Sequence, residues 1–293
     1  MNRHYEFHDG KTLDIGQRTL VMGILNYTPD SFSDGGRWNT IDKALAHMRQ
    51  MVDDGADIID VGAESTRPGS ASLTPEEEQA RLLPLLRELL PACPVPVSVD
   101  TYHAETADRA AALGAHILND IWGLQYADEP TGAMASVAAR YGLPVIVMHN
   151  QTGTDYPGSI LDAMRAFFAR SVEIADKAGV DRSAIILDPG IGFGKTTAQN
   201  LHVLRHQGEL RRLDGQEYPW LLAASRKRYI GDTLGLPVGE RVEATGATCV
   251  LGIAAGADIV RVHDVKPIAR MCRMADAILR ADESMGLSEP SRQ

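Results

Sequence analysis

Residues 20–36 read LVMGILNYTPDSFSDGG, an apolar run that stops at Asn26 and continues as a polar segment ending in two glycines. The run 20–25 lacks the alternation of a half-exposed strand, so it predicts a strand buried on both faces, as in a parallel sheet. Connections after such strands are usually short. The long acidic segment after Asn26 therefore indicates a loop with a function of its own.

Seven more runs of the same kind follow, at 57–61, 95–99, 116–118, 144–148, 184–187, 220–224 and 258–262. Stretches with helical spacing lie between them, as in 40–54. Thr74 and Glu77 form a capping box with proline at the first helical position, and Gly55 and Gly142 follow helices where a left-handed cap is needed. The alternation predicts an α/β protein.

Eight strands, each followed by a helix, predict a single (β/α)8 TIM barrel over 19–282. A doubly wound open sheet is the alternative arrangement. Residues 1–18 contain a predicted β-hairpin that turns at Asp9-Gly10, and 283–293 form a C-terminal tail. The whole chain, 1–293, is thus expected to be one domain.

Composition excludes several classes of protein. The 293 residues carry a formal net charge of −10, which argues against a nucleic-acid-binding face. Cys93, Cys249 and Cys272 are isolated and indicate neither a disulfide framework nor a zinc site. No apolar run approaches the roughly 20 residues that span a bilayer. We therefore expect a cytoplasmic globular protein that binds neither nucleic acids nor membranes.

Polar residues end every predicted strand, and the carboxyl ends of barrel strands are where active sites are built. They are Asn26, Asp60, Asp100, Asn119-Asp120, His149-Asn150, Asp188, Ser225-Arg226-Lys227, and Arg261 with His263-Asp264. Any one of them could be an ordinary turn former. Together they predict a polar pocket at one mouth of the barrel.

The pocket residues divide by chemistry into two groups. Asp100, Asn119 and Asp188 can pair with a flat heterocycle that carries N–H donors and ring acceptors. A second group supplies positive charge suited to phosphate oxygens: Arg67, Arg226, Lys227, Arg261 and His263. A ligand with both a heterocycle and a phosphate would use both groups.

The stretch DPGIGFGKT at 188–196 is similar to two nucleotide-binding motifs but fits neither. Pro189 stands where a P-loop begins with glycine, and Lys195 stands where the dinucleotide motif ends with glycine. We interpret it as a glycine-rich loop that carries Asp188 and Phe193, and the pattern leaves open whether Phe193 is exposed or buried. His149 and His263 differ from the other histidines only by their positions at strand ends.

Seven stretches together resemble the dihydropteroate synthase family of folate biosynthesis, which sulfonamides inhibit. They are LNYTPDSFSDGG (25–36), VGAESTRPG (61–69), SVDT (98–101), LND (118–120), DPGIGFGKT (188–196), ASRK (224–227) and RVHDV (261–265). The resemblance covers nearly the whole barrel and implies the same (β/α)8 fold. It also implies a Mg2+-assisted transferase reaction, in which 6-hydroxymethyl-7,8-dihydropterin diphosphate and 4-aminobenzoate give 7,8-dihydropteroate and diphosphate.

The resemblance further implies roles for individual residues. The pterin ring would be held by Asp100, Asn119, Asp188 and Lys227. The diphosphate would face Asn26, Thr66, Arg261 and His263, with Asn26 also a magnesium ligand. The aminobenzoate side would be shaped by Arg67, Pro68, Phe193, Ser225 and Lys227. Catalysis would rest on Lys227, Arg261, His263 and Arg67, and the loops after Asn26 and at 65–69 would close over the diphosphate.

Two other functions would use the same pterin contacts. A methyltetrahydrofolate-dependent methyltransferase would need neither the STRPG stretch nor the RVH stretch, and both are present. A non-catalytic pterin-binding paralogue is disfavoured by the intact Lys227, Arg261 and Phe193. Departures from the family pattern, such as Ala63 and Ala223 in place of glycine, affect none of the named residues. The resemblance implies a homodimer, although core packing explains the apolar face at 268–279 equally well.

Overall fold

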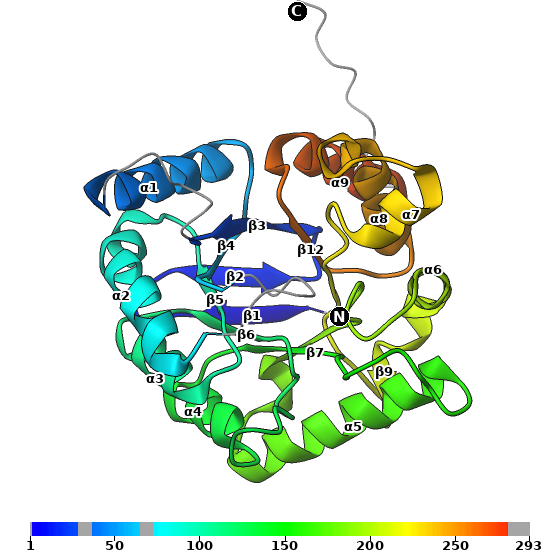
Figure 1. The fold of residues 1–293 in the computed structure, drawn as a ribbon, viewed down its shortest axis with the longest axis horizontal. Helices are drawn as coiled ribbons and strands as arrows, with labels where there is room; N and C mark the ends of the chain where they lie inside the picture. The colour runs from blue at the N-terminus through cyan, green and yellow to red at the C-terminus, as the bar shows by residue number, and fades with distance from the viewer. Residues whose placement is uncertain (1, 29–36, 65–72, 281–293) are drawn as a thin grey trace, which may run out of the picture.

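The computed structural model describes residues 2–28, 37–64 and 73–280. Within them, parallel strands form an eight-stranded sheet enclosed by helices (Figure 1). In sheet order the strands are β11 (Leu221–Leu222), β12 (Ile259–Val262), β3 (Leu20–Asn26), β4 (Ile58–Gly62), β5 (Val97–Asp100), β6 (Ile117–Asp120), β7 (Val145–Met148) and β8 (Ile185–Asp188). Each predicted apolar run is thus a strand.

The helices follow the strands as the alternation predicts. They are α1 (Arg37–Asp53), α2 (Pro75–Ala92), α3 (Ala104–Ala112), α4 (Ala133–Tyr141), α5 (Ile160–Ala178), α6 (Thr197–His206), α7 (Arg228–Leu234), α8 (Val242–Ala254) and α9 (Val265–Leu279), with short 3-10 turns at Arg182–Ala184, Gln207–Glu209 and Val238–Glu240. Thr74 makes both hydrogen bonds of its predicted capping box, and Gly142 caps α4 in the left-handed region with φ 63°. In the described ranges, every helix is too short or too polar to cross a membrane.

The barrel closes between its first and last strands in sheet order. β11 is only two residues long, but the preceding Trp220 forms a parallel bridge with Leu187 of β8. The Leu187 N–H donates to the Pro219 carbonyl at 2.9 Å. The structure therefore has the predicted (β/α)8 barrel rather than an open sheet.

Alternation along the strands separates the two sides of the sheet. Val21, Ile59 and Val97 pack against the helices. Their neighbours Leu20, Ile58 and others point inward and form a buried apolar layer across the barrel. The inward layer is completed by Met22, Ile117, Ile146, Ile186, Leu221, Ala223 and Ile259.

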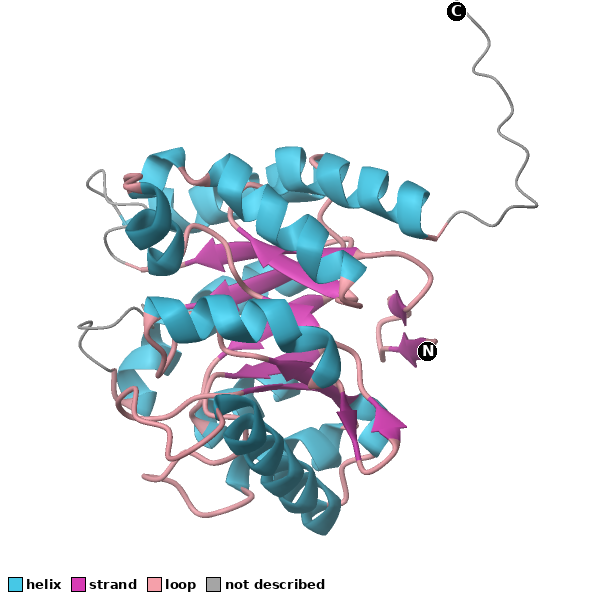
Figure 2. Ribbon diagram, turned by 90° about the vertical axis from the view of Figure 1, so that its right-hand side faces the viewer, coloured by secondary structure: helices cyan, strands magenta, loops and turns pink. Residues whose placement is uncertain are grey.

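The predicted N-terminal hairpin closes the end of the barrel where the strands begin (Figure 2). β1 (Arg3–Glu6) pairs with β2 (Thr12–Ile15), and Gly10 takes the left-handed conformation in the turn, with φ 83°. Phe7, Leu13 and Ile15 join the inward apolar layer, so the hairpin is a plug.

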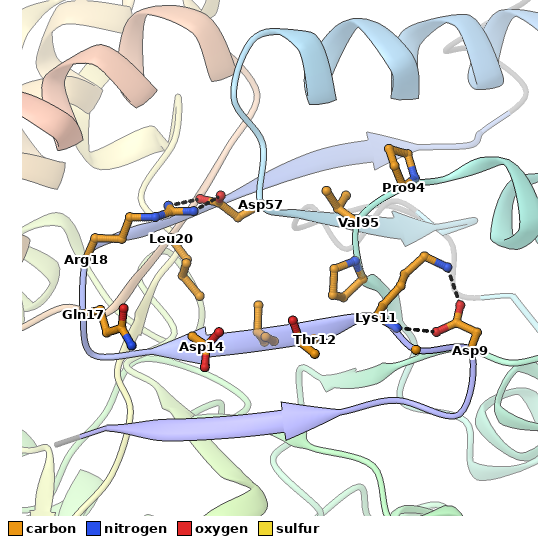
Figure 3. A pocket seen from close by; sticks show the side chains of 13 residues that line it. Asp9, Lys11, Thr12, Asp14, Gln17, Arg18, Leu20, Asp57, Pro94 and Val95 are labelled. Carbon is orange, nitrogen blue, oxygen red and sulfur yellow. Dashed lines mark hydrogen bonds and ion pairs between the residues drawn. The ribbon is translucent and has the colours of Figure 1, made fainter.

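A pocket of about 620 Å³ lies beside this hairpin, lined by residues of β2 and of the segments that enter β4 and β5 (Figure 3). Four of its charged groups are paired with one another: Lys11 with Asp9, and Arg18 with Asp57 at 2.6 Å. It is at the opposite end from the strand termini that the sequence predicts as the site.

A second hairpin was not predicted. β9 (Arg212–Leu213) and β10 (Gln216–Glu217) are joined by Asp214 and Gly215, both with positive φ. Asp-Gly between two extended segments is the signal of such a turn. The strands are short, and the turn lies before β11, away from the polar strand ends.

Candidate active site

The same alternation that builds the apolar layer places the polar residues in the next inward layer. Moving two residues along a strand returns to the same face. The pairs of inward-facing residues that lie two positions apart on one strand are Ile58 and Asp60, Ser98 and Asp100, Ile117 and Asn119, Ile186 and Asp188, and Ile259 and Arg261. Asp100 is directly opposite Asn119 in the strand register. The structure therefore brings the predicted strand-end residues together at the carboxyl end of the barrel.

Arg261 is the centre of this layer. Its guanidinium donates from Nε to Asp60 Oδ2 and from Nη2 to Asp100 Oδ2, each at 2.6 Å. Asp60 is fully buried and also accepts from Asn119 Nδ2 at 3.3 Å. Two buried carboxylates therefore share one guanidinium.

Free acceptor capacity remains in the cluster. Asp100 Oδ1 is buried and has no hydrogen-bond partner among the residues that the structure describes. Burial, opposed by Arg261, raises the pKa of Asp100 to about 7, and burial also raises the pKa of Asp188. Buried polar atoms are normally satisfied. A buried carboxylate oxygen without a partner, at the carboxyl end of β5, is suited to an N–H group of a ligand.

Lys227 borders the carboxylates on the side of the glycine-rich loop. Its Nζ donates to the Ile191 carbonyl and lies 4.5 Å from the centre of the Phe193 ring. Burial lowers the pKa of Lys227 to about 8, although Asp188 raises it. Phe193 is half-buried and packs on a small apolar group that includes Met148. The sequence left open whether Phe193 is exposed or buried, and in the structure the residue is partly buried.

The ends of β11, β12 and β3 supply the remaining described residues. His263 Nδ1 lies 3.0 Å from Ser225 Oγ, which also accepts from the His263 backbone N–H at 3.2 Å. Asn26 ends β3 opposite Gly62. The predicted Thr66, Arg67 and Pro68 lie outside the described residues, as do residues 29–36 of the loop after β3.

Two strand-end residues have structural partners of their own. Arg226, predicted to face phosphate, instead donates to Asp264 from Nε at 2.8 Å, so its charge is taken up by that carboxylate. Asp120 accepts the backbone N–H groups of Trp122 and Leu124 at 2.8 and 2.7 Å and holds the turn after β6. These residues shape the mouth of the barrel from outside the carboxylate cluster.

Sequence reasoning missed the importance of three residues. Asp60 belongs to the strand-end set but received no role, although it is the buried partner of Arg261. Lys195 and His149 were left unassigned, yet Lys195 Nζ lies 2.9 Å from His149 Nδ1 in a buried contact. The Asp60 signal is available in the sequence, since a charged residue inside an apolar strand requires a partner.

A buried set of carboxylates, an amide and two cations at the carboxyl end of a (β/α)8 barrel is the arrangement of an enzyme active site. The sequence pattern of the family described as pterin binding enzyme matches residues 22–263. The dihydropteroate synthase of Bacillus subtilis is 53% identical over 267 residues, 91% of each chain.

Solved structures agree with this match. A Clostridium difficile dihydropteroate synthase, crystallised in the presence of pteroic acid, is 48% identical with a TM-score of 0.87, and the match covers 92% of this chain and 100% of that one. A Xanthomonas albilineans dihydropteroate synthase with 4-aminobenzoic acid is 35% identical with the same TM-score, covering 96% and 100%. The chain therefore belongs to the pterin-binding enzyme family. Within it, the chain groups with the dihydropteroate synthases, which are transferases.

Proposed function

We propose that this chain condenses 6-hydroxymethyl-7,8-dihydropterin diphosphate with 4-aminobenzoate to form 7,8-dihydropteroate and diphosphate. The observation that carries the proposal is the buried layer of Asp60, Asp100, Asn119 and Arg261, with the free Asp100 Oδ1. Pteroic acid and 4-aminobenzoic acid appear with the two related structures described above, and they are the product skeleton and the second substrate of this reaction.

A synthase assay on the purified protein tests this assignment. Both substrates together with Mg2+ should yield equal amounts of dihydropteroate and diphosphate. A pterin-binding protein without turnover would identify a non-catalytic paralogue. Methyl transfer from methyltetrahydrofolate would identify the methyltransferase alternative.

The pterin ring belongs with the carboxylate cluster. Asp100, Asn119 and Asp188 offer two acceptor groups and an amide at the ends of β5, β6 and β8, which match the N–H donors and ring nitrogens of a pterin. Arg261 holds Asp100 in place through its Nη2 contact of 2.6 Å. A ligand without these complementary groups would leave buried polar atoms unpaired, so the cluster selects against it.

The reacting carbon is the methylene group attached to the ring. Its bond to the diphosphate oxygen breaks, and the electron pair leaves with the diphosphate. The electron-rich ring delocalises the resulting positive charge. The amine nitrogen then supplies its electron pair to the carbon and loses a proton. This step needs stabilisation of the leaving charge and orientation of the amine more than acid–base catalysis.

The leaving diphosphate faces Asn26, Arg261 and His263 in this proposal, with Thr66 added on the resemblance. Ser225 Oγ and His263 Nδ1 lie 3.0 Å apart, so both can contact one anion. Arg261 links this side with the pterin carboxylates. These groups bind and orient the diphosphate, and they offset its charge as it leaves.

Mg2+ fits the donor set on the same side. Mg2+ keeps several of its waters and takes only one or two protein oxygens besides substrate phosphates. Asn26 offers such an oxygen at the end of β3, and in the described residues there is no group of three His, Cys, Asp or Glu side chains that could form an all-protein cage. Asn26 would hold the ion, which when bound would neutralise charge on the diphosphate.

The amine substrate is placed against Phe193, Lys227 and Ser225, with Arg67 and Pro68 implied by the resemblance. The partly buried Phe193 ring offers an aromatic surface for stacking, and Lys227 Nζ lies 4.5 Å from its centroid. Sulfonamides, which mimic 4-aminobenzoate, are expected to compete at this position.

Protonation of Asp100 should weaken pterin binding at low pH. The pKa of Asp100 in the free protein is raised to about 7, and the ring N–H groups need the carboxylate form. Below that pH, binding must release the proton, so affinity for a pterin analogue should fall by up to about tenfold per pH unit. Calorimetry across this pH range measures how the affinity changes with pH.

Asp100→Asn should weaken binding by about 1.5–3 kcal/mol at high pH and make the affinity nearly independent of pH. Equal slopes in both proteins would contradict the assignment.

We also propose a cytoplasmic homodimer. Leu251 of α8 and Met274 and Ile278 of α9 are 70%, 62% and 68% exposed, a large apolar area on two neighbouring helices. Such a face indicates a contact with another molecule, and the resemblance implies a second copy. The buried free thiols Cys93, Cys249 and Cys272 suit a reducing compartment. Sedimentation of wild type and Ile278→Glu tests the dimer.

A further inference from the structure

The loop between β8 and α6 is held unusually close to the segment that follows β7. Gly190, Gly192 and Gly194 all have positive φ, at 62°, 87° and 54°. A Cβ atom at Gly190 would lie 1.9 Å from the His149 carbonyl oxygen, and one at Gly194 would lie 2.7 Å from that of Gln151. The glycines are therefore required by backbone conformation and by close approach, rather than by phosphate binding.

Lys195 is the central contact of this arrangement. Its Nζ donates to the carbonyls of Gly190 and Phe193, each at 3.0 Å, and lies 2.9 Å from His149 Nδ1. The three acceptors match the three donors of an ammonium. Burial lowers the pKa of Lys195 to about 7, although Asp188 raises it. Burial and the neighbouring Lys195 lower the pKa of His149, so its ring is neutral and Nδ1 can accept.

Neighbouring side chains secure the rest of the loop. Asn200 Oδ1 accepts the Gly192 N–H at 2.7 Å, and Tyr156 donates to the Gly194 carbonyl at 2.7 Å. Lys227 donates to the Ile191 carbonyl between the two carbonyls that Lys195 holds. Because Lys227 is also expected to contact substrate, a loop fixed by Lys227 alone would loosen during binding. Lys195 is 8% exposed, so its contacts with the loop are shielded from solvent.

A buried ammonium costs free energy that a neutral donor would not. Asn200 and Tyr156 show that amide and hydroxyl groups can hold loop atoms here without a charge. The particular feature of Lys195 is that one group ties both ends of the 190–193 turn to β7 through His149. This fixes the direction in which Phe193 presents its ring.

We propose that Lys195, with His149 as its acceptor, is a positioning residue that fixes the Phe193 ring and the Ile191 carbonyl for the arylamine substrate. It acts through the loop and does not touch the substrate. The inference rests on the proposed function, since that proposal places 4-aminobenzoate against Phe193. The backbone of Asp188 is held by β8, which it ends in register with Met148, and its carboxylate accepts the Gly190 backbone N–H at 2.7 Å.

Lys195→Met tests the inference, because methionine keeps much of the side-chain length and removes all three donors. We expect the KM for 4-aminobenzoate to rise by about tenfold while kcat falls by no more than about threefold. Affinity for a pterin analogue should stay within about twofold of wild type, since Asp100, Asn119 and Asp188 lie on strands. Lys177→Met, the same change at an exposed lysine of α5 paired with Glu173, is the matched control and should leave all three values unchanged.

A double-mutant cycle with Phe193→Ala identifies the route of the effect. If Lys195 acts through Phe193, the double variant should have nearly the KM of Phe193→Ala alone. His149→Phe keeps ring packing beside Phe167, at 4.9 Å between centroids, and removes only the acceptor, so it should raise the same KM by about threefold. If Lys195→Met does not fold, His149→Phe still tests the positioning role of the Lys195–His149 contact.

Three outcomes would overturn the inference: an unchanged amine KM in a folded Lys195→Met or His149→Phe variant, a parallel loss of pterin affinity, or additive effects in the cycle. A wild-type protein without synthase turnover would instead overturn the proposed function.

Discussion

Arg261→Met should lower the free energy of unfolding by about 3–5 kcal/mol and abolish synthase turnover. The guanidinium is the shared partner of Asp60 and Asp100, with contacts of 2.6 Å to each carboxylate. Without it, two buried carboxylates face each other with no cation between them, and Asp60 is fully buried. The pterin cluster would lose its geometry together with its charge balance. Urea unfolding monitored by circular dichroism gives the free energy directly.

Two further variants distinguish the cost of leaving buried carboxylates without a cation from the cost of removing any arginine side chain. Arg226→Met removes a partly exposed arginine that pairs with Asp264, so its cost should be below about 1 kcal/mol. Adding Asp60→Asn to Arg261→Met should restore part of the lost stability, because one stranded carboxylate is removed, but it should not restore turnover. An Arg261→Met protein as stable as wild type would show that Arg261 does not balance these carboxylates.

The backbone arrangement of the site was predictable because it depends on local patterns. Buried strands were recognisable as apolar runs, and the period of two carries Ile58 to Asp60 and Ile259 to Arg261 on one face. A closed barrel then places all strand ends at one mouth. Fold and site location therefore follow from residues close together in the sequence.

Side-chain partners were less predictable because they join residues far apart. Arg261 and Asp60 are 201 positions apart, and Lys195 and His149 are 46 apart. Sequence reasoning placed Arg261 with the diphosphate and grouped Arg226 with the phosphate-binding cations. In the structure, Arg261 lies between carboxylates and Arg226 pairs with Asp264. Several cations near several acids permit many pairings, and only the three-dimensional distances select among them.

Lys227→Met should reduce kcat/KM by about a thousandfold, equivalent to about 4 kcal/mol of transition-state stabilisation. The expectation follows from its place between the two substrate regions. Its ammonium is influenced by Asp188 on the pterin side and lies 4.5 Å from the Phe193 ring on the amine side. Both KM values should therefore rise, together with a fall in kcat. This pattern contrasts with Lys195→Met, in which the amine KM should rise, the pterin affinity should be kept and kcat should fall by no more than about threefold.

The pH dependence gives an independent check on Lys227. Burial lowers its pKa to about 8, so the wild-type ammonium should lose its proton above about that pH and kcat/KM should decline there. The decline should disappear in Lys227→Met, which has no group to titrate. Lys227→Arg should not restore activity, because the side chain packs closely on the loop: a Cβ at Gly192 would lie 2.9 Å from Lys227 Cδ. If Lys227→Met raised the amine KM alone, Lys227 would be a second support of the loop like Lys195, and the pterin ring would have to be held by the strand-end carboxylates and Asn119 without it.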